Sequence, residues 1–160
     1  MIKNNLIKEF LVVFLIFLLD RISKIYVIYL DKLNNNSEIF LSKFLNIRLY
    51  WNEGIAFGLL SFDKENLYNS LTIIIFLVIL VIYLMAIKNK GMKKYFFLMI
   101  LGGAIGNFYD RVIFKAVPDF IDFHVGNYHW FIFNIADIFI TLGVIFMIFS
   151  EFFSTTNNNE

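Results

Sequence analysis

The stretch LTIIIFLVILVIYLMAI, residues 71–87, carries no charged side chain and would be apolar on every face of a helix. Its length is close to the roughly 20 residues that a helix needs to cross the hydrocarbon core of a bilayer. A helix buried in a soluble core seldom stays apolar all round for so long. The stretch therefore predicts a membrane-spanning helix, which we place at residues 68–87.

The composition of the whole chain agrees with a membrane protein. Of 160 residues, 59% are hydrophobic and 17% are charged, and the length fits one compact unit. A net charge of +1 gives no reason to expect a nucleic-acid partner. The absence of Cys excludes a disulfide framework, a thiolate nucleophile and a Cys-based metal site.

Three further apolar segments, at residues 6–30, 95–108 and 131–153, resemble spans. We therefore predict an all-α integral membrane protein with four transmembrane helices, forming one domain over residues 1–153 with a disordered tail at 154–160. The first segment is not followed by a small-residue cleavage pattern, which favours an uncleaved span over a signal peptide. The third is short, and lysines at its start would extend it by snorkelling.

The distribution of basic residues predicts the orientation. Lysines precede the first segment and crowd the connection at 88–94, whereas residues 31–67 carry slightly more acidic than basic side chains. By the positive-inside rule both termini and the 88–94 connection face the cytoplasm, and residues 31–67 and 109–130 face outward. Within the first outer region, LNIRLYWN at residues 45–52 alternates apolar and polar side chains, which predicts a small extracytoplasmic β element.

Polar residues gather at the predicted outer end of this bundle. Asn134 and Asp137 share a helix face at the start of the fourth segment, and Asp110 and Arg111 end the third. Asp119 and a second carboxylate, Asp122, lie in the connection between those segments. One Asp at a helix entry has a simple explanation in the helix dipole. Several carboxylates at one depth indicate a functional site instead.

Two neighbouring carboxylates in a low-dielectric site share one proton and titrate as a unit. This is the arrangement of an aspartic protease, in which one carboxylate accepts a proton from water and the other donates to the scissile carbonyl. It needs neither a metal nor a cofactor, and we predict none. His124 and His129 alone are weak evidence for a metal, so we interpret them as loop or interfacial residues.

Other polar and small residues fit around this site. Asp20 and Lys24 are spaced for an intrahelical ion pair, and Asn52 and Gly54 are placed to line a cleft. Gly102 and Gly106 form a small-xxx-small pattern that is typical of close helix packing.

The motifs LLDRISK, WNEGIAFG, GGAIGNFYDR, VPDFIDF and FNIAD, in this order over four spans, resemble those of lipoprotein signal peptidase (signal peptidase II). The resemblance runs from Asp20 to about Gly143. It implies a multi-pass aspartyl endopeptidase of the bacterial inner membrane, with its active site near the outer face, and we expect a monomer. Such enzymes remove signal peptides from prolipoproteins by cutting before a Cys that carries diacylglycerol, and they contact membrane lipids.

The resemblance also assigns residues. Its catalytic pair maps onto Asp119 and Asp137, with Asp110 as the rival partner of Asp137. The positions expected from it to shape the site or contact substrate are Asp20, Asn52, Gly54, Asn107, Asp110, Arg111 and Asn134. We add Lys24 to this set because it is spaced to pair with Asp20.

Two other classes remain open from the residues alone. A proton-coupled transporter would use the carboxylates as a relay, although confinement of the charges to one end argues against a path across the bilayer. A structural membrane protein would use Asp–Arg pairs only to fix helix packing.

Overall fold

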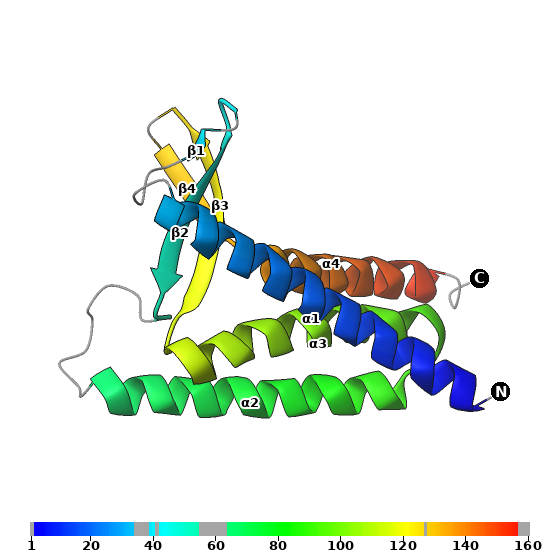
Figure 1. The fold of residues 1–160 in the computed structure, drawn as a ribbon. Helices are drawn as coiled ribbons and strands as arrows, with labels where there is room; N and C mark the ends of the chain where they lie inside the picture. The colour runs from blue at the N-terminus through cyan, green and yellow to red at the C-terminus, as the bar shows by residue number, and fades with distance from the viewer. Residues whose placement is uncertain (1, 34–38, 41, 55–63, 127, 157–160) are drawn as a thin grey trace.

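The computed structural model describes residues 2–33, 39–40, 42–54, 64–126 and 128–156. Four helices form an elongated bundle, and a small antiparallel sheet stands at one end of it (Figure 1). The two chain termini and the α2–α3 connection lie together at the other end (Figure 1). Much of the predicted 31–67 outer region and the last part of the predicted tail lie outside the described residues.

The helices are α1 (Ile2–Leu33), α2 (Lys64–Lys88), α3 (Gly91–Phe114) and α4 (Ile135–Thr156). Three of them are long and apolar enough to cross a membrane, over Glu65–Lys88, Gly91–Phe114 and Ile135–Phe153. The remaining helix, α1, is long enough, but charged residues interrupt its apolar run. The chain is therefore a mostly helical membrane protein.

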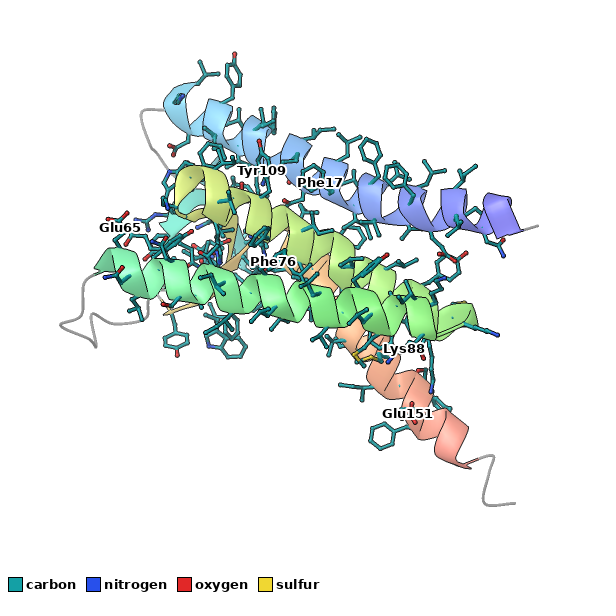
Figure 2. All side chains as sticks on the ribbon, turned by 90° about the horizontal axis from the view of Figure 1, so that it is seen from below. Phe17, Glu65, Phe76, Lys88, Tyr109 and Glu151 are labelled. Atoms are coloured by element: carbon teal, nitrogen blue, oxygen red, sulfur yellow. The ribbon has the colours of Figure 1, made fainter. Side chains whose placement is uncertain are left out.

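The exposed side chains of α2 indicate that this bundle is surrounded by lipid rather than by water. Large apolar residues are exposed on most of its surface, among them Ile73, Leu77, Val81 and Leu84. A contiguous apolar surface of this extent is not tolerated on a soluble monomer. Figure 2 shows side chains along the whole of α2, from Glu65 near its start to Lys88 at its end.

Helix α3 is the centre of the bundle and packs against each of the other three helices. Aromatic side chains fill two of these interfaces. Phe17 meets Tyr109 edge-on (Figure 2), with ring centroids 5.8 Å apart. Phe76 meets Phe108, also with ring centroids 5.8 Å apart. Helix interfaces in lipid depend on such van der Waals contacts because burial from lipid adds little.

Glycines on α3 let its neighbours approach closely. A Cβ on Gly102 would lie 2.9 Å from the Cβ of Ile16 in α1, which confirms close packing at the predicted small-xxx-small pattern. A Cβ on Gly103 would collide with the backbone carbonyl of Ala136 in α4. Because a carbonyl in a helix cannot move independently, any side chain at Gly103 pushes α4 away.

The sheet has the strand order β1-β2-β3-β4 and is antiparallel throughout. Its strands are β1 (Ile39–Phe40), β2 (Leu45–Asn52), β3 (Val117–Val125) and β4 (Tyr128–Phe133). Strand β3 follows α3 directly, and β4 runs directly into α4. The sheet is thus tied to the bundle by the helices that frame the candidate site.

Several sequence predictions need correction here. The term all-α was too narrow, since β3 and β4 join the predicted strand at 45–52. Residues 131–133, predicted as the start of the fourth helix, belong to β4, where Phe133 pairs with Ile121. The helix begins only at Ile135 because Asn134 caps it, and it continues beyond Phe153 to Thr156. The third helix extends well beyond 95–108 in both directions.

We predict that Gly103→Ala lowers the free energy of unfolding by about 3 kcal/mol, as expected for a severely overpacked contact. Gly91→Ala is the matched control, because a Cβ there would have nothing within 4 Å and only the positive φ of 60° is strained. That strain costs about 1 kcal/mol. Thermal unfolding in detergent compares the two variants, and a Gly103→Ala effect no larger than that of Gly91→Ala would contradict this packing.

Candidate active site

Asp119 lies on β3 with only 3% of its surface exposed. Both of its carboxylate oxygens accept hydrogen bonds from side-chain amides. Asn52 Nδ2 donates to Oδ2 at 2.9 Å, and Asn134 Nδ2 donates to Oδ1 at 2.6 Å. The carboxylate is therefore held from β2 on one side and from the start of α4 on the other.

Asp137 is fixed by the first turn of α4. The Asn134 carbonyl accepts the first helical hydrogen bond from Ile138 N, so Asn134 is the N-cap. Its side-chain Oδ1 accepts from Asp137 N at 3.1 Å, and Asp137 Oδ2 accepts from Asn134 N at 3.1 Å. This reciprocal pair is a capping box built from Asn and Asp. Two otherwise unpaired backbone donors are satisfied, and the Asp137 carboxylate is oriented.

Asn134 joins the two carboxylates. It is fully buried, its backbone N–H binds Asp137, and its Nδ2 binds both Asp119 and the Oδ1 of Asn107. Asn107 in α3 then donates its own Nδ2 to Asp137 Oδ1 at 2.7 Å. Asp119 and Asp137 thus belong to one hydrogen-bonded cluster contributed by β3, α3 and α4.

A buried ammonium fixes the orientation of Asn107. Lys24 in α1 is 1% exposed, and its Nζ donates to Asn107 Oδ1 at 2.9 Å, Asp20 Oδ2 at 2.9 Å and Asp110 Oδ2 at 2.7 Å. These bonds use all the donors of the ammonium group. Because Asn107 Oδ1 is held by Lys24, its Nδ2 is the end that must face Asp137.

The two carboxylates around Lys24 have a second cation. Arg21 forms a two-pronged ion pair with Asp110, with Nη1 2.5 Å from Oδ1 and Nη2 2.6 Å from Oδ2. Its guanidinium also lies over the Tyr109 ring, 4.9 Å from the centroid. Two formal negative and two formal positive charges therefore balance in a buried ionic cluster, which we define as Asp20, Arg21, Lys24 and Asp110.

Asp20 links this ionic cluster to α4. Its Oδ1 accepts a hydrogen bond of 3.1 Å from Ala136 N, which is an unpaired donor in the first turn of α4. The carboxylate also lies where the helix dipole favours negative charge. Gly106 makes room for it, since a Cβ there would lie 2.6 Å from Asp20 Oδ2.

Asn52 is oriented by a turn at the end of β2. Its Oδ1 accepts from Gly54 N at 2.8 Å, so its Nδ2 faces Asp119. Gly54 has a φ of 74°, a conformation that favours glycine. The Arg111 guanidinium lies beside this turn, 3.4 Å from the position of a Cβ on Gly54. Arg111 Nη1 is buried without a hydrogen-bond partner among the described residues.

Burial raises the pKa of Asp119 above its ordinary value. The hydrogen bonds from Asn52 and Asn134 oppose this shift, the negative charge of Asp137 adds to it, and the positive charge of Lys24 opposes it again. The net effect is a pKa of Asp119 above its ordinary value.

The structure brings together most of the residues predicted from the sequence. The connected set comprises Asp20, Lys24, Asn52, Gly54, Asn107, Asp110, Asp119, Asn134 and Asp137. Arg111 is not part of this hydrogen-bonded set, although its guanidinium lies beside Gly54, and the ion pairs of Asp110 are with Arg21 and Lys24. The predicted Asp20–Lys24 ion pair is confirmed at 2.9 Å.

Sequence reasoning missed Arg21, which holds Asp110. Arg21 and Asp20 are adjacent in the sequence, a spacing that does not mark a side-chain pair on a helix, so no local pattern identified Arg21. It also missed a contact on the sheet between His129 Nδ1 and Asp122 Oδ2, at 2.7 Å. Only the pairing of β3 with β4 brings these residues together.

A polytopic helical bundle with two carboxylates in one hydrogen-bonded cluster has the groups that aspartic-type chemistry uses. Comparisons with known proteins make this specific. The family described as "Peptidase_A8: Signal peptidase (SPase) II" matches residues 12–153. The chain therefore belongs to the lipoprotein signal peptidase (signal peptidase II) family.

Individual relatives agree over nearly the full chain. It is 47% identical to a lipoprotein signal peptidase of Pelagibacter ubique (strain HTCC1062), covering 98% of this chain and 95% of that protein. It is 36% identical to a lipoprotein signal peptidase of Francisella tularensis subsp. novicida (strain U112), covering 94% and 97%.

Solved structures of bacterial membrane enzymes are similar as well. One, determined by the in meso method, is 30% identical and covers 94% of this chain and 90% of its own, with a TM-score of 0.69. Another covers 89% and 91% with a TM-score of 0.72, also at 30% identity.

Membership of this family selects the peptidase over the transporter and the structural alternatives. The chain is a signal peptidase II, an aspartic-type peptidase that cleaves the signal peptides of prolipoproteins. It is a multi-pass bacterial membrane enzyme.

We predict that two substitutions of Asn134 separate its capping role from its amide role. Asn134→Ala loses both and is expected to lower the free energy of unfolding by about 2 kcal/mol. Asn134→Ser keeps a capping oxygen for Asp137 N and recovers about half of that loss. Because both variants lack the amide donor to Asp119, both should lose at least about tenfold in kcat/KM. Thermal unfolding and a cleavage assay test this, and wild-type activity in Asn134→Ser would contradict the amide role.

Proposed function

We propose that Asp119 and Asp137 are the catalytic dyad and that the enzyme cuts prolipoproteins before a Cys that carries diacylglycerol. The observation that carries the assignment is Asn134, which hydrogen-bonds both carboxylates at once. Asp110 and Asp20 are the alternative carboxylates, but their ion pairs with Lys24 and Arg21 neutralise them. A carboxylate held by a buried cation is poorly suited to exchange protons with water.

The environments of the two carboxylates assign their roles. Burial raises the pKa of Asp119, so we assign it as the acid that donates to the scissile carbonyl oxygen. Asp137 accepts hydrogen bonds from Asn107 Nδ2 and Asn134 N–H and is less buried, so it is the carboxylate base that meets water.

The reaction then proceeds in two steps, addition of water to the carbonyl and cleavage of the C–N bond. Asp137 takes a proton from water as the water oxygen bonds to the carbonyl carbon, and Asp119 gives its proton to the carbonyl oxygen. In the second step Asp119 recovers a proton from the tetrahedral diol, and Asp137 donates its proton to the leaving nitrogen as the C–N bond breaks. An acid and an amine are released, and both carboxylates return to their starting states.

A groove beside Asp137 supports lateral entry of a lipid-bearing substrate. It has a volume of about 500 Å³ and is lined by apolar side chains of β4 and α4, including Phe131, Phe133, Ile138 and Leu142. Apolar walls of this kind suit an acyl chain or an apolar signal peptide that arrives from the bilayer. Asp137 also lines this groove, so a substrate bound there would have its scissile bond near the dyad.

We further propose that α1 is the fourth span and that the sheet end faces outward. The exposed face of α1 is apolar, whereas its charged Asp20, Arg21 and Lys24 point into the protein. At the other end, the ion pairs Lys94–Glu9 and Lys93–Glu151 bring the basic α2–α3 connection near both chain termini. By the positive-inside rule this end is cytoplasmic. We also propose a monomer, because residues of the same chain already donate hydrogen bonds to both oxygens of Asp119 and of Asp137.

We predict that Asp119→Asn and Asp137→Asn each lower kcat by about 100- to 10,000-fold, the range lost when a general acid or base is removed. The assay follows cleavage of a prolipoprotein with and without diacylglycerol on its Cys, using purified enzyme in detergent. Wild-type enzyme should cut only the lipidated form.

Two other carboxylates serve as controls in the same assay. Asp31→Asn, in the last turns of α1, should keep wild-type kcat. Asp110→Asn leaves Lys24 and Arg21 with excess buried charge and should mainly lower the Tm. If folded Asp110→Asn lost turnover while Asp119→Asn stayed active, the peptidase activity would stand but the Asp119–Asp137 dyad would be contradicted.

The hydrogen bond from Asn52 predicts a shift in pH dependence. This bond favours ionised Asp119, so Asn52→Ala raises the pKa of Asp119 further. Because Asp119 acts as an acid and is lost to ionisation as pH rises, the basic limb of the kcat/KM profile should move to higher pH. Tyr50→Phe is the control, since exposed Tyr50 pairs with Asp119 only through the backbone register. An unmoved basic limb in Asn52→Ala would contradict the acid role of Asp119.

A further inference from the structure

We propose that Asp122, His124 and His129 form a Zn²⁺ site on the sheet, separate from the peptidase dyad. The three side chains each offer one ligand atom, and these atoms lie within 4.8 Å of one another. Two His and one carboxylate, completed by water, are a ligand set that zinc accepts in tetrahedral geometry. This proposal does not depend on the catalytic assignment.

The strand geometry explains why these residues converge. Asp122 and His124 are two positions apart on β3, so they project from the same face. The register between β3 and β4 shifts after Phe123, and His124 is paired with His129 rather than with Trp130. Such a bulge re-aims the side chains around it. His129 is thereby turned to the His124 face, where the two rings stack with centroids 5.3 Å apart.

The burial of the cluster gives an independent reason to expect a ligand. Asp122 is completely buried and its Oδ1 has no hydrogen-bond partner among the described residues. His124 is 7% exposed, and its Nδ1 is likewise buried and unpartnered within that part of the chain. An unsatisfied buried carboxylate oxygen or ring nitrogen costs stability. One metal ion would satisfy both atoms.

The arrangement also leaves a path for the ion. The His129 side chain is 42% exposed, so the third ligand can admit the metal from solvent. His129 Nδ1 lies 2.7 Å from Asp122 Oδ2, and Zn²⁺ would replace the proton that these groups share. The candidate ligand atoms already lie within 4.8 Å of one another, so side-chain rotations alone can bring them to zinc bonds of about 2.0–2.2 Å.

A bound ion would cross-link β3 and β4, the hairpin that positions the proposed dyad. Asp119 lies on β3, and the end of β4 leads directly to the cap at Asn134. Alternation along β3 puts Asp119 and Asp122 on opposite faces of the strand, so the ion would not touch the reacting groups. Its effect is therefore stabilisation of the framework rather than participation in hydrolysis.

Thermal unfolding with Zn²⁺ tests the proposal. The full chain, without a polyhistidine tag and treated with EDTA, is unfolded in detergent with and without added Zn²⁺. We expect Zn²⁺ to raise the Tm of the wild-type protein by several degrees, because it binds the native state alone. Mg²⁺, which prefers oxygen ligands, should not do so.

Variants assign the effect to this cluster. His124→Gln and His129→Gln should each abolish the Zn²⁺-dependent shift whatever their own Tm, and Tyr128→Phe, beside His129 on β4, should keep it. A Co²⁺ titration gives a second readout, since visible absorption of the bound ion should saturate at one equivalent in the wild type and be lost in both His variants. No Zn²⁺ shift in the wild type, or a shift that survives in both His variants, would overturn the site.

Discussion

The candidate site depends on one buried ammonium. Lys24 lies at the interface of α1 and α3 with every donor engaged, by Asp20, Asp110 and Asn107. A cation removed from water in this way is tolerated only when its charge and its hydrogen bonds are matched, and loss of one partner of such a pair costs about 3–5 kcal/mol. Arg21 completes the balance at Asp110. The residues around Lys24 are consequently confined to one arrangement.

The side-chain amides of Asn107 and Asn134 connect this cluster to the two carboxylates of the proposed dyad, and each amide is held in one orientation. Lys24 holds the oxygen of Asn107, and the nitrogen of Asn107 then holds Asp137. Asp20 reaches the first turn of α4, where the Asn134 cap orients Asp137 and binds Asp119. The bare backbones of the α3 glycines let these helices approach closely enough for the chain of contacts to close. At this end of the bundle, helix packing and the hydrogen bonds of the charged residues therefore depend on each other.

The sequence is most informative where a local pattern carries the physics. Uniform apolarity identifies α2, and motif spacing places Asn134 beside Asp137. The sequence is least informative about residues that are far apart in the chain and come into contact only after folding. Only Asn134 separates the apolar run at 131–133 from the apolar start of α4, so the pattern predicts helix where β4 lies. Arg21 pairs with Asp110 across two helices, and a bulge near Trp130 pairs His129 with His124. No sequence window contains those contacts.

An experimental structure of the enzyme with a non-cleavable diacylglyceryl lipopeptide would test the dyad by direct observation. We predict that the scissile carbonyl lies between Asp119 and Asp137, within about 2.6–3.2 Å of each carboxylate or one water away. The acyl chains should lie in the groove formed by β4 and α4. A carbonyl bound at Asp110, or in contact with only one member of the pair, would contradict the assignment.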